Sequence, residues 1–177
     1  MEYFKKKRTF TAYVRKVDPK NKKQKQSAVT GGGDAGTKLV IMLTLDCPIT
    51  KPMRVSMSPS VQAWIESNTG DKAAGEVLEK VVPEKEKQNA YYTFAFTNEE
   101  QKQPAISRGG KDGGNALLTV ERYFILEGEA FVQIKMQADF DKELWAWCGD
   151  HLDKSQTANA VRVDVQPLQG NLPGTDE

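Results

Sequence analysis

Apolar and polar positions alternate along residues 9–17, TFTAYVRKV. Tyr13 and Arg15 share one face of this segment with Thr11. The opposite face is apolar throughout and consists of Phe10, Ala12 and Val14. A two-residue period in β-branched and aromatic residues predicts a strand. We therefore expect the apolar face to enter a core and Tyr13 and Arg15 to point away from it.

Six further segments show patterns that are typical of strands. Residues 38–46 are apolar on both faces, which predicts a central strand covered on both sides. Residues 116–126 and 130–138 flank a short turn that contains Gly128, and this spacing suits a hairpin. The remaining predicted strands are short and comprise residues 53–57, 91–97 and 161–165.

Three segments carry helical signals. Ser58 suits an N-cap and Pro59 suits the first helical position, so a helix is expected to begin there. A second helical segment is expected over residues 71–82. A third helix, of about 11 residues, is expected after the acidic pair Asp139 and Asp141.

The order of these elements predicts a mainly β fold (a β-rich α+β domain). Residues 18–37 and 98–115 are long, polar and rich in glycine, and we expect them to be loops. Many short strands favour an antiparallel sheet that closes into a barrel or curves strongly. Over residues 9–126 the order resembles that of the OB-fold, in which loops flank a ligand-binding face. The alternative is a two-layer α+β sandwich with both helices on one face.

The chain is long enough for one domain, which we expect over residues 9–166. Within it, the second hairpin arm, the last helix and the last strand are expected to be additions to the barrel. Residues 1–8 are expected to form a basic N-terminal arm, and residues 167–177 a flexible tail.

Charge divides the chain into two unlike regions. Residues 5–25 contain ten of the 25 Lys and Arg residues and one carboxylate, Asp18. This segment therefore carries a formal charge of +9, and the rest of the chain −8, within a net charge of +1. Four aromatic residues lie in or beside the basic segment, namely Tyr3, Phe4, Phe10 and Tyr13.

Cations interleaved with aromatic rings are the two kinds of group that hold single-stranded nucleic acid. The sequence therefore predicts sequence-independent binding of single-stranded nucleic acid, DNA before RNA, with no enzymatic activity. Tyr13 and Arg15 are the strongest candidates because they lie on a rigid strand, and Tyr91 is a second stacking candidate. The full predicted site comprises Lys5, Lys6, Lys7, Arg8, Tyr13, Arg15, Lys20, Lys22, Lys23, Lys25, Tyr91, Arg108 and Lys111. The alternative is a protein-binding module, such as an inhibitor or adaptor of the kind that mobile elements encode, which docks on an acidic partner. A homo-oligomer is also left open.

Motifs for other chemistry are weak. Gly31 and Gly36 have the spacing of a phosphate-binding loop, but a strand follows where a helix should begin. Cys148 and His151 could share a metal ion, yet two ligands are too few for a site. We therefore expect no cofactor, no metal and no catalytic residue. The sequence shows no secretory signal and no apolar run long enough to span a bilayer, which predicts a cytoplasmic protein.

Overall fold

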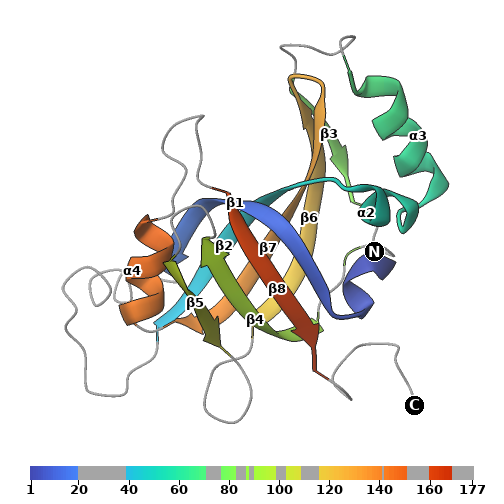
Figure 1. The fold of residues 1–177 in the computed structure, drawn as a ribbon. Helices are drawn as coiled ribbons and strands as arrows, with labels where there is room; N and C mark the ends of the chain where they lie inside the picture. Colours follow the sequence, from blue (N-terminus) through green and yellow to red (C-terminus); the bar gives the residue numbers. More distant parts are fainter. Residues whose placement is uncertain are drawn as a thin grey trace.

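The computed structural model describes residues 1–19, 39–70, 77–82, 87, 90–98, 103–108, 116–140, 142–150 and 160–168. Figure 1 shows the arrangement of the elements that these residues form. Their bounds, in chain order, are η1 (Glu2–Lys5), β1 (Arg8–Pro19), β2 (Leu39–Pro48), α2 (Lys51–Val55), α3 (Pro59–Asn68), β3 (Val77–Val81), β4 (Ala90–Asn98), β5 (Gln103–Arg108), β6 (Ala116–Leu126), β7 (Glu129–Phe140), α4 (Lys142–Asp150) and β8 (Val161–Pro167).

Six antiparallel strands close into a barrel in the order β1, β2, β7, β6, β4, β8. The ring closes where β4 meets β6, through the pairs from Ala90↔Leu118 to Tyr92↔Ala116. This arrangement confirms the expected mainly β, antiparallel barrel and is consistent with an OB-like barrel. Closure removes the exposed edges that an open sheet of the same strands would present.

Two long strands each serve two neighbours along one edge. The first residues of β6 pair with β4, and its last residues, Arg122 to Leu126, pair with β3 on the same edge. The β6–β7 hairpin therefore continues past the barrel and carries β3 beside it, as Figure 1 shows. In the same way β4 closes the barrel with its first residues and pairs with β5 from Phe94 to Asn98.

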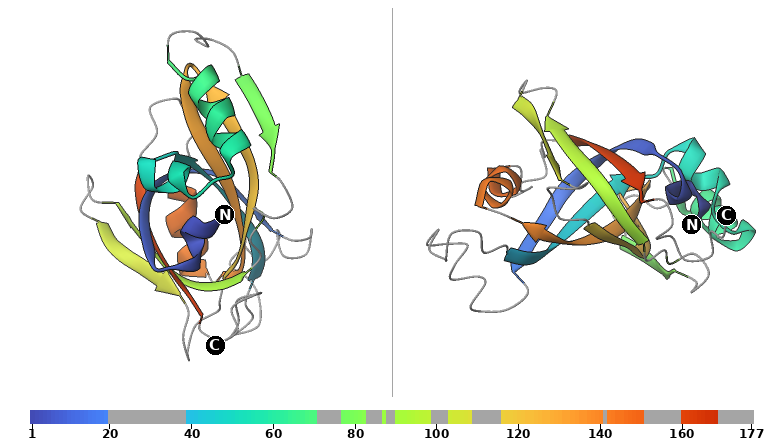
Figure 2. Two further views of the ribbon diagram at one scale, coloured as in Figure 1. Left: turned by 90° about the vertical axis from the view of Figure 1, so that its right-hand side faces the viewer. Right: turned by 90° about the horizontal axis from the view of Figure 1, so that it is seen from below.

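The alternating residues of the strands fill the barrel. Phe10, Ala12 and Val14 of β1 are buried, as the sequence pattern predicts. The three aromatic residues of β4 that share its inner face are also buried, namely Tyr92, Phe94 and Phe96. Figure 2 shows that α4 and the α2–α3 pair lie on opposite sides of the barrel. None of the helices in the described part of the chain is long and apolar enough to cross a membrane.

The N-terminal residues belong to the core, which corrects the expectation that residues 1–8 lie outside the domain. Tyr3 and Phe4 of η1 are 4% and 0% exposed, and their rings make edge-to-face contacts with each other and with Phe10. The Tyr92 hydroxyl donates a buried hydrogen bond of 2.7 Å to the Phe4 carbonyl oxygen. Burial of these aromatic rings holds η1 against the core, although the lysines that follow in the sequence are hydrophilic.

Residues 53–57 were expected to form a strand, and this prediction is wrong. Residues 51–55 form the short helix α2, whose N-cap Thr50 accepts a hydrogen bond from the Met53 amide. Pro52 occupies the first turn, where a missing N–H is harmless. The spacing of Met53 and Met57 fits one face of a helical turn as well as one face of a strand, and both are buried.

Two further predictions of secondary structure are wrong. Residues 77–81 form strand β3 rather than the end of a helix, because they pair with the extended part of β6. Residues 103–108 form β5 inside the expected loop over 98–115. The C-terminal segment also differs from expectation, since β7 and β8 are barrel strands and not additions to a completed barrel.

The remaining elements confirm the sequence patterns. Strand β2, the β6–β7 hairpin, β4, α3, α4 and β8 lie where the hydrophobic pattern predicts them. Glu127 and Gly128, in the hairpin turn, have φ angles of 52° and 78°, which suits the tight turn between twisted strands. Asp18 and Pro19, the first residues of the expected loop over 18–37, belong instead to β1 and pair with Met42 and Ile41 of β2. The rest of that loop and residues 169–177 lie outside the described residues.

Candidate nucleic-acid interface

A β-bulge in β1 forms the centre of the candidate interface. Val14 pairs with Leu45, whereas the next paired residue of β1 is Lys16, which faces Thr44. Arg15 is therefore the extra residue of the bulge. Because Lys16 pairs with the outward-facing Thr44 and Arg15 bonds to a residue on that same side, both cations lie on the outer surface of the barrel.

Tyr13 and Arg15 lie together, as the sequence predicts. The guanidinium carbon of Arg15 is 5.4 Å from the centroid of the Tyr13 ring, within the range of a cation–π contact. Both side chains are half-buried, so each keeps part of its surface accessible to a ligand. The strand thus presents an aromatic ring and two cations within four consecutive residues.

Asp46 of β2 fixes the position of Arg15. Its Oδ2 atom accepts a hydrogen bond of 2.7 Å from Arg15 Nε, and its Oδ1 atom accepts one of 2.9 Å from Gln133 Nε2 on β7. Asp46 is only 5% exposed, so the carboxylate is almost fully enclosed by these neighbours. A buried carboxylate with two donors holds its partners in one geometry.

The hydrogen-bonded chain continues across the barrel surface. Gln133 Oε1 accepts a bond of 3.2 Å from Arg122 Nε on β6, and Arg122 in turn pairs with Glu79 of β3. Arg122 also lies over the Phe124 ring, at 4.8 Å from its centroid. The network therefore links β1, β2, β7, β6 and β3 and rigidifies this face.

A second row of residues runs beside this network. Register places Lys16 of β1, Thr44 of β2 and Lys135 of β7 next to one another across three strands. Thr44 is only 6% exposed, although it points outward, which places it beneath its neighbours. Within the described residues, neither lysine is in ion-pair range of a carboxylate. Lys16 and Lys135 are therefore cations available to a ligand.

The other cations at the N-terminus lie apart from this row. Lys5, Lys6 and Lys7 are exposed, and Lys5 pairs with Glu2 at 2.8 Å, which lowers the pKa of that carboxyl. Arg8 donates a bond of 2.7 Å to the Tyr3 carbonyl oxygen and lies 4.4 Å from the centre of the Tyr3 ring. Arg8 thus serves the packing of η1. Burial raises the pKa of Tyr3, and the positive charge of Arg8 opposes this rise.

Tyr91 does not lie on the same surface as Tyr13. It is 47% exposed on the outer face of β4, which pairs with β5, β6 and β8 but not with β1, β2 or β7. The backbone of Arg108 lies in β5, opposite Phe94. The remaining predicted residues fall outside the described part of the chain, namely Lys20, Lys22, Lys23, Lys25 and Lys111.

Sequence reasoning missed Lys16, Asp46, Gln133 and Lys135 as members of this site. The alternation in β7 does show that Gln133 and Lys135 point outward. It does not show that β7 lies beside β2 and only one strand away from Tyr13, because that neighbour relation depends on the closure of the barrel. The Asp46 contact likewise requires the register of β1 against β2.

Other chemistry finds little support among the described residues. No group of three or more His, Cys, Asp or Glu side chains within them could hold a metal ion. Cys47 and Cys148 are buried thiols, and burial raises the pKa of Cys47 well above its ordinary value. His151, the other residue of the metal alternative, lies outside the described ranges.

Comparisons with protein-family models, with curated proteins and with solved structures find no significant match to this chain. The functional argument therefore depends on the geometry of the described residues.

Proposed function

We propose that this chain binds single-stranded nucleic acid along the outer face of β1, β2 and β7, without reading its sequence. One observation carries the proposal: the Tyr13–Arg15 cation–π pair lies on the same surface as Lys16 and Lys135, which form no ion pair with any described residue. An aromatic face for a base beside cations for the backbone is the combination that holds single strands.

The geometry suits a single strand better than a duplex. A base can stack on Tyr13 only when it is unpaired and its face is accessible. Lys16 lies on β1 and Lys135 on β7, the two strands on either side of β2, so their backbones are two strand spacings apart, about 10 Å. That separation lets both contact phosphates of one strand beside a stacked base.

Electrostatics favours modest affinity with a clear dependence on salt. Arg15 is paired with Asp46, and Arg122 with Glu79, so these ion pairs add little net charge to the face. Attraction then comes mainly from Lys16 and Lys135, and from the lysines that follow β1 in the sequence. Each phosphate contact on a single strand contributes about −0.7 to the slope of log K against log salt.

The test is the binding of a fluorescein-labelled oligodeoxythymidine, measured by anisotropy beside a duplex of the same length. Tyr13→Leu should lose about 1–3 kcal/mol of stacking, which raises the Kd roughly 5- to 150-fold. Tyr91→Leu is the matched control, because it removes an exposed tyrosine from a strand outside the face, and it should change Kd less. Absence of binding at low salt, or equal effects of the two substitutions, would overturn the proposal.

A further inference from the structure

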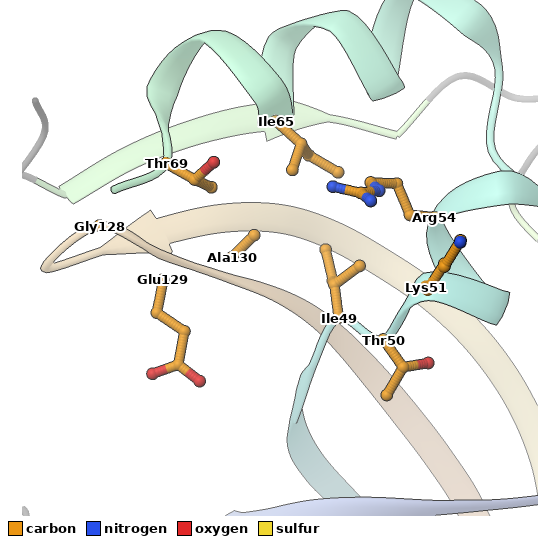
Figure 3. A pocket seen from close by; sticks show the side chains of 9 residues that line it. All are labelled: Ile49, Thr50, Lys51, Arg54, Ile65, Thr69, Gly128, Glu129 and Ala130. Atoms are coloured by element: carbon orange, nitrogen blue, oxygen red, sulfur yellow. The ribbon is translucent and has the colours of Figure 1, made fainter. Parts of the chain in front are cut away.

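A groove lies between the tip of the β6–β7 hairpin and helices α2 and α3, and its lining residues differ from those proposed to bind nucleic acid. It has a volume of about 270 Å³. Its apolar lining comes from three elements, with Ile49 after β2, Ile65 on α3 and Ala130 on β7. In Figure 3, Ile65 points down from α3 toward Ala130 and Ile49 on the opposite side.

One end of the groove is positively charged. Lys51 and Arg54 of α2 line it, and the Arg54 side chain extends into the space below α3 (Figure 3). The carboxylate of Glu129, which also lines the groove, points away from Arg54 in the same view. Within the described residues, neither cation forms an ion pair. The groove therefore offers unpaired positive charge beside an apolar surface.

Two backbone hydrogen bonds join the segments that line the groove. The Gly70 amide, just after α3, donates a 2.9 Å bond to the Gly128 carbonyl in the hairpin turn. The Ile49 amide donates a 2.9 Å bond to the Ala130 carbonyl. A groove that is already formed requires little ordering when a ligand enters, and this favours binding.

We infer that this groove binds an acidic segment of a partner protein that presents one leucine-sized side chain next to carboxylates. The apolar lining would take the side chain, and Lys51 and Arg54 would take the carboxylates. A volume slightly below that of ordinary small-molecule pockets suits one side chain of an extended chain.

Nucleic acid is the less suitable ligand for this groove. Among the described residues that line it none is aromatic, so they offer no surface on which a base could stack. Its two cations lie within one turn of α2 and do not form a track along which a phosphate backbone could run. The inference is therefore independent of the proposed nucleic-acid interface and can fail or succeed separately.

The experiment uses methyl NMR on the full chain with labelled isoleucine and alanine methyl groups. The probe is a synthetic peptide of alternating Asp, Leu and Glu, and the neutral control peptide replaces Asp and Glu by Asn and Gln. The acidic peptide should shift the methyl signals of Ile49, Ile65 and Ala130 and bind about tenfold more tightly than the neutral one, a difference of about 1.4 kcal/mol. Equal binding of both peptides, or shifts confined to other methyl groups, would overturn the inference.

Charge variants distinguish binding of the acidic peptide in the groove from non-specific electrostatic attraction to the protein. Arg54→Gln should weaken binding of the acidic peptide about tenfold. Arg162→Gln, which removes an arginine from the outer face of β8, should leave it unchanged. Arg54→Glu should reverse the preference toward a Lys- and Leu-containing peptide. Unchanged affinity in both Arg54 variants would contradict the inference, as would an oligodeoxythymidine that shifts the groove methyl groups more strongly than the acidic peptide.

Discussion

Asp46 should be the most sensitive polar residue on the barrel surface. Asp46→Ala removes the acceptor of two side-chain hydrogen bonds, from Arg15 and from Gln133. Truncating one partner of a fully buried ion pair destabilises a protein by about 3–5 kcal/mol. The Arg15 side chain is 29% exposed, so water can solvate part of the released charge, and the expected loss is smaller, about 2–3 kcal/mol.

The assay is urea denaturation followed by tryptophan fluorescence. The midpoint should fall at constant m, because the compactness of the two end states does not change. In a thermal scan the same loss lowers Tm by about 5–10 °C. Asp46→Asn retains one acceptor oxygen and nearly the same volume, so about 1–2 kcal/mol should be lost.

A double-mutant cycle tests the physical reason. Arg15→Gln combined with Asp46→Asn should show a coupling of about 1 kcal/mol or more, because each group is the partner of the other. A loss below about 0.5 kcal/mol in Asp46→Ala, or a coupling near zero, would refute the reasoning, since such small effects are typical of exposed pairs.

Three further predictions follow from packing and burial. Phe4→Ala should destabilise the fold by about 3–5 kcal/mol in urea denaturation, because Phe4 is fully buried; a loss under 1 kcal/mol, roughly that of a surface change, would place η1 outside the core. Gly128→Ala should destabilise by roughly 1–3 kcal/mol, since φ is +78° and a Cβ would lie 2.3 Å from the Gly70 carbonyl oxygen, whereas a neutral effect would contradict that close approach. Because burial raises the pKa of the Cys47 thiol, the folded state keeps that proton. Stability should therefore be fully present below about pH 9 and decline above it, and Cys47→Ala should decline less; an identical alkaline decline in this variant would exclude the thiol as its cause.

The local sequence pattern predicted correctly those elements whose conformation does not depend on which strands they pair with. The alternation in β1 and β4 identified both the strands and their inner faces, because every second residue of a barrel strand must be buried. The β6–β7 hairpin was equally predictable, since its glycine-containing turn and its paired strands are contiguous in the sequence. Local sequence patterns were therefore sufficient to predict the fold class.

Tertiary pairing decided the elements that were predicted wrongly. Val77–Val81 has apolar positions at helical spacing. It forms a strand because residues 122–126 of β6, which extend past the barrel, supply backbone hydrogen-bonding partners. Met53 and Met57 fit two periods, and the Thr50 cap with Pro52 selected the helix. The lysines near the N-terminus led to the prediction of a basic arm, whereas the adjacent Tyr3 and Phe4 rings are buried.

The candidate site was predictable in part. Tyr13 and Arg15 could be placed outward from the pattern alone. The bulge that brings Lys16 to the same face could not, because it exists only in the register against β2. The same is true of Lys135, which lies beside Thr44 only once β7 has paired with β2.

The central claim, that a single strand binds across β1, β2 and β7, is tested most directly by a salt titration of three proteins. Lys16→Gln with Lys135→Gln removes two proposed phosphate contacts, and Lys51→Gln with Arg54→Gln removes the same charge from α2. At about 0.7 per contact, the first pair should reduce the slope of log K against log salt by about 1.4. The second pair should leave the slope of the wild-type protein unchanged. Equal reductions in both double variants, or no salt-dependent binding by the wild-type protein, would contradict the account.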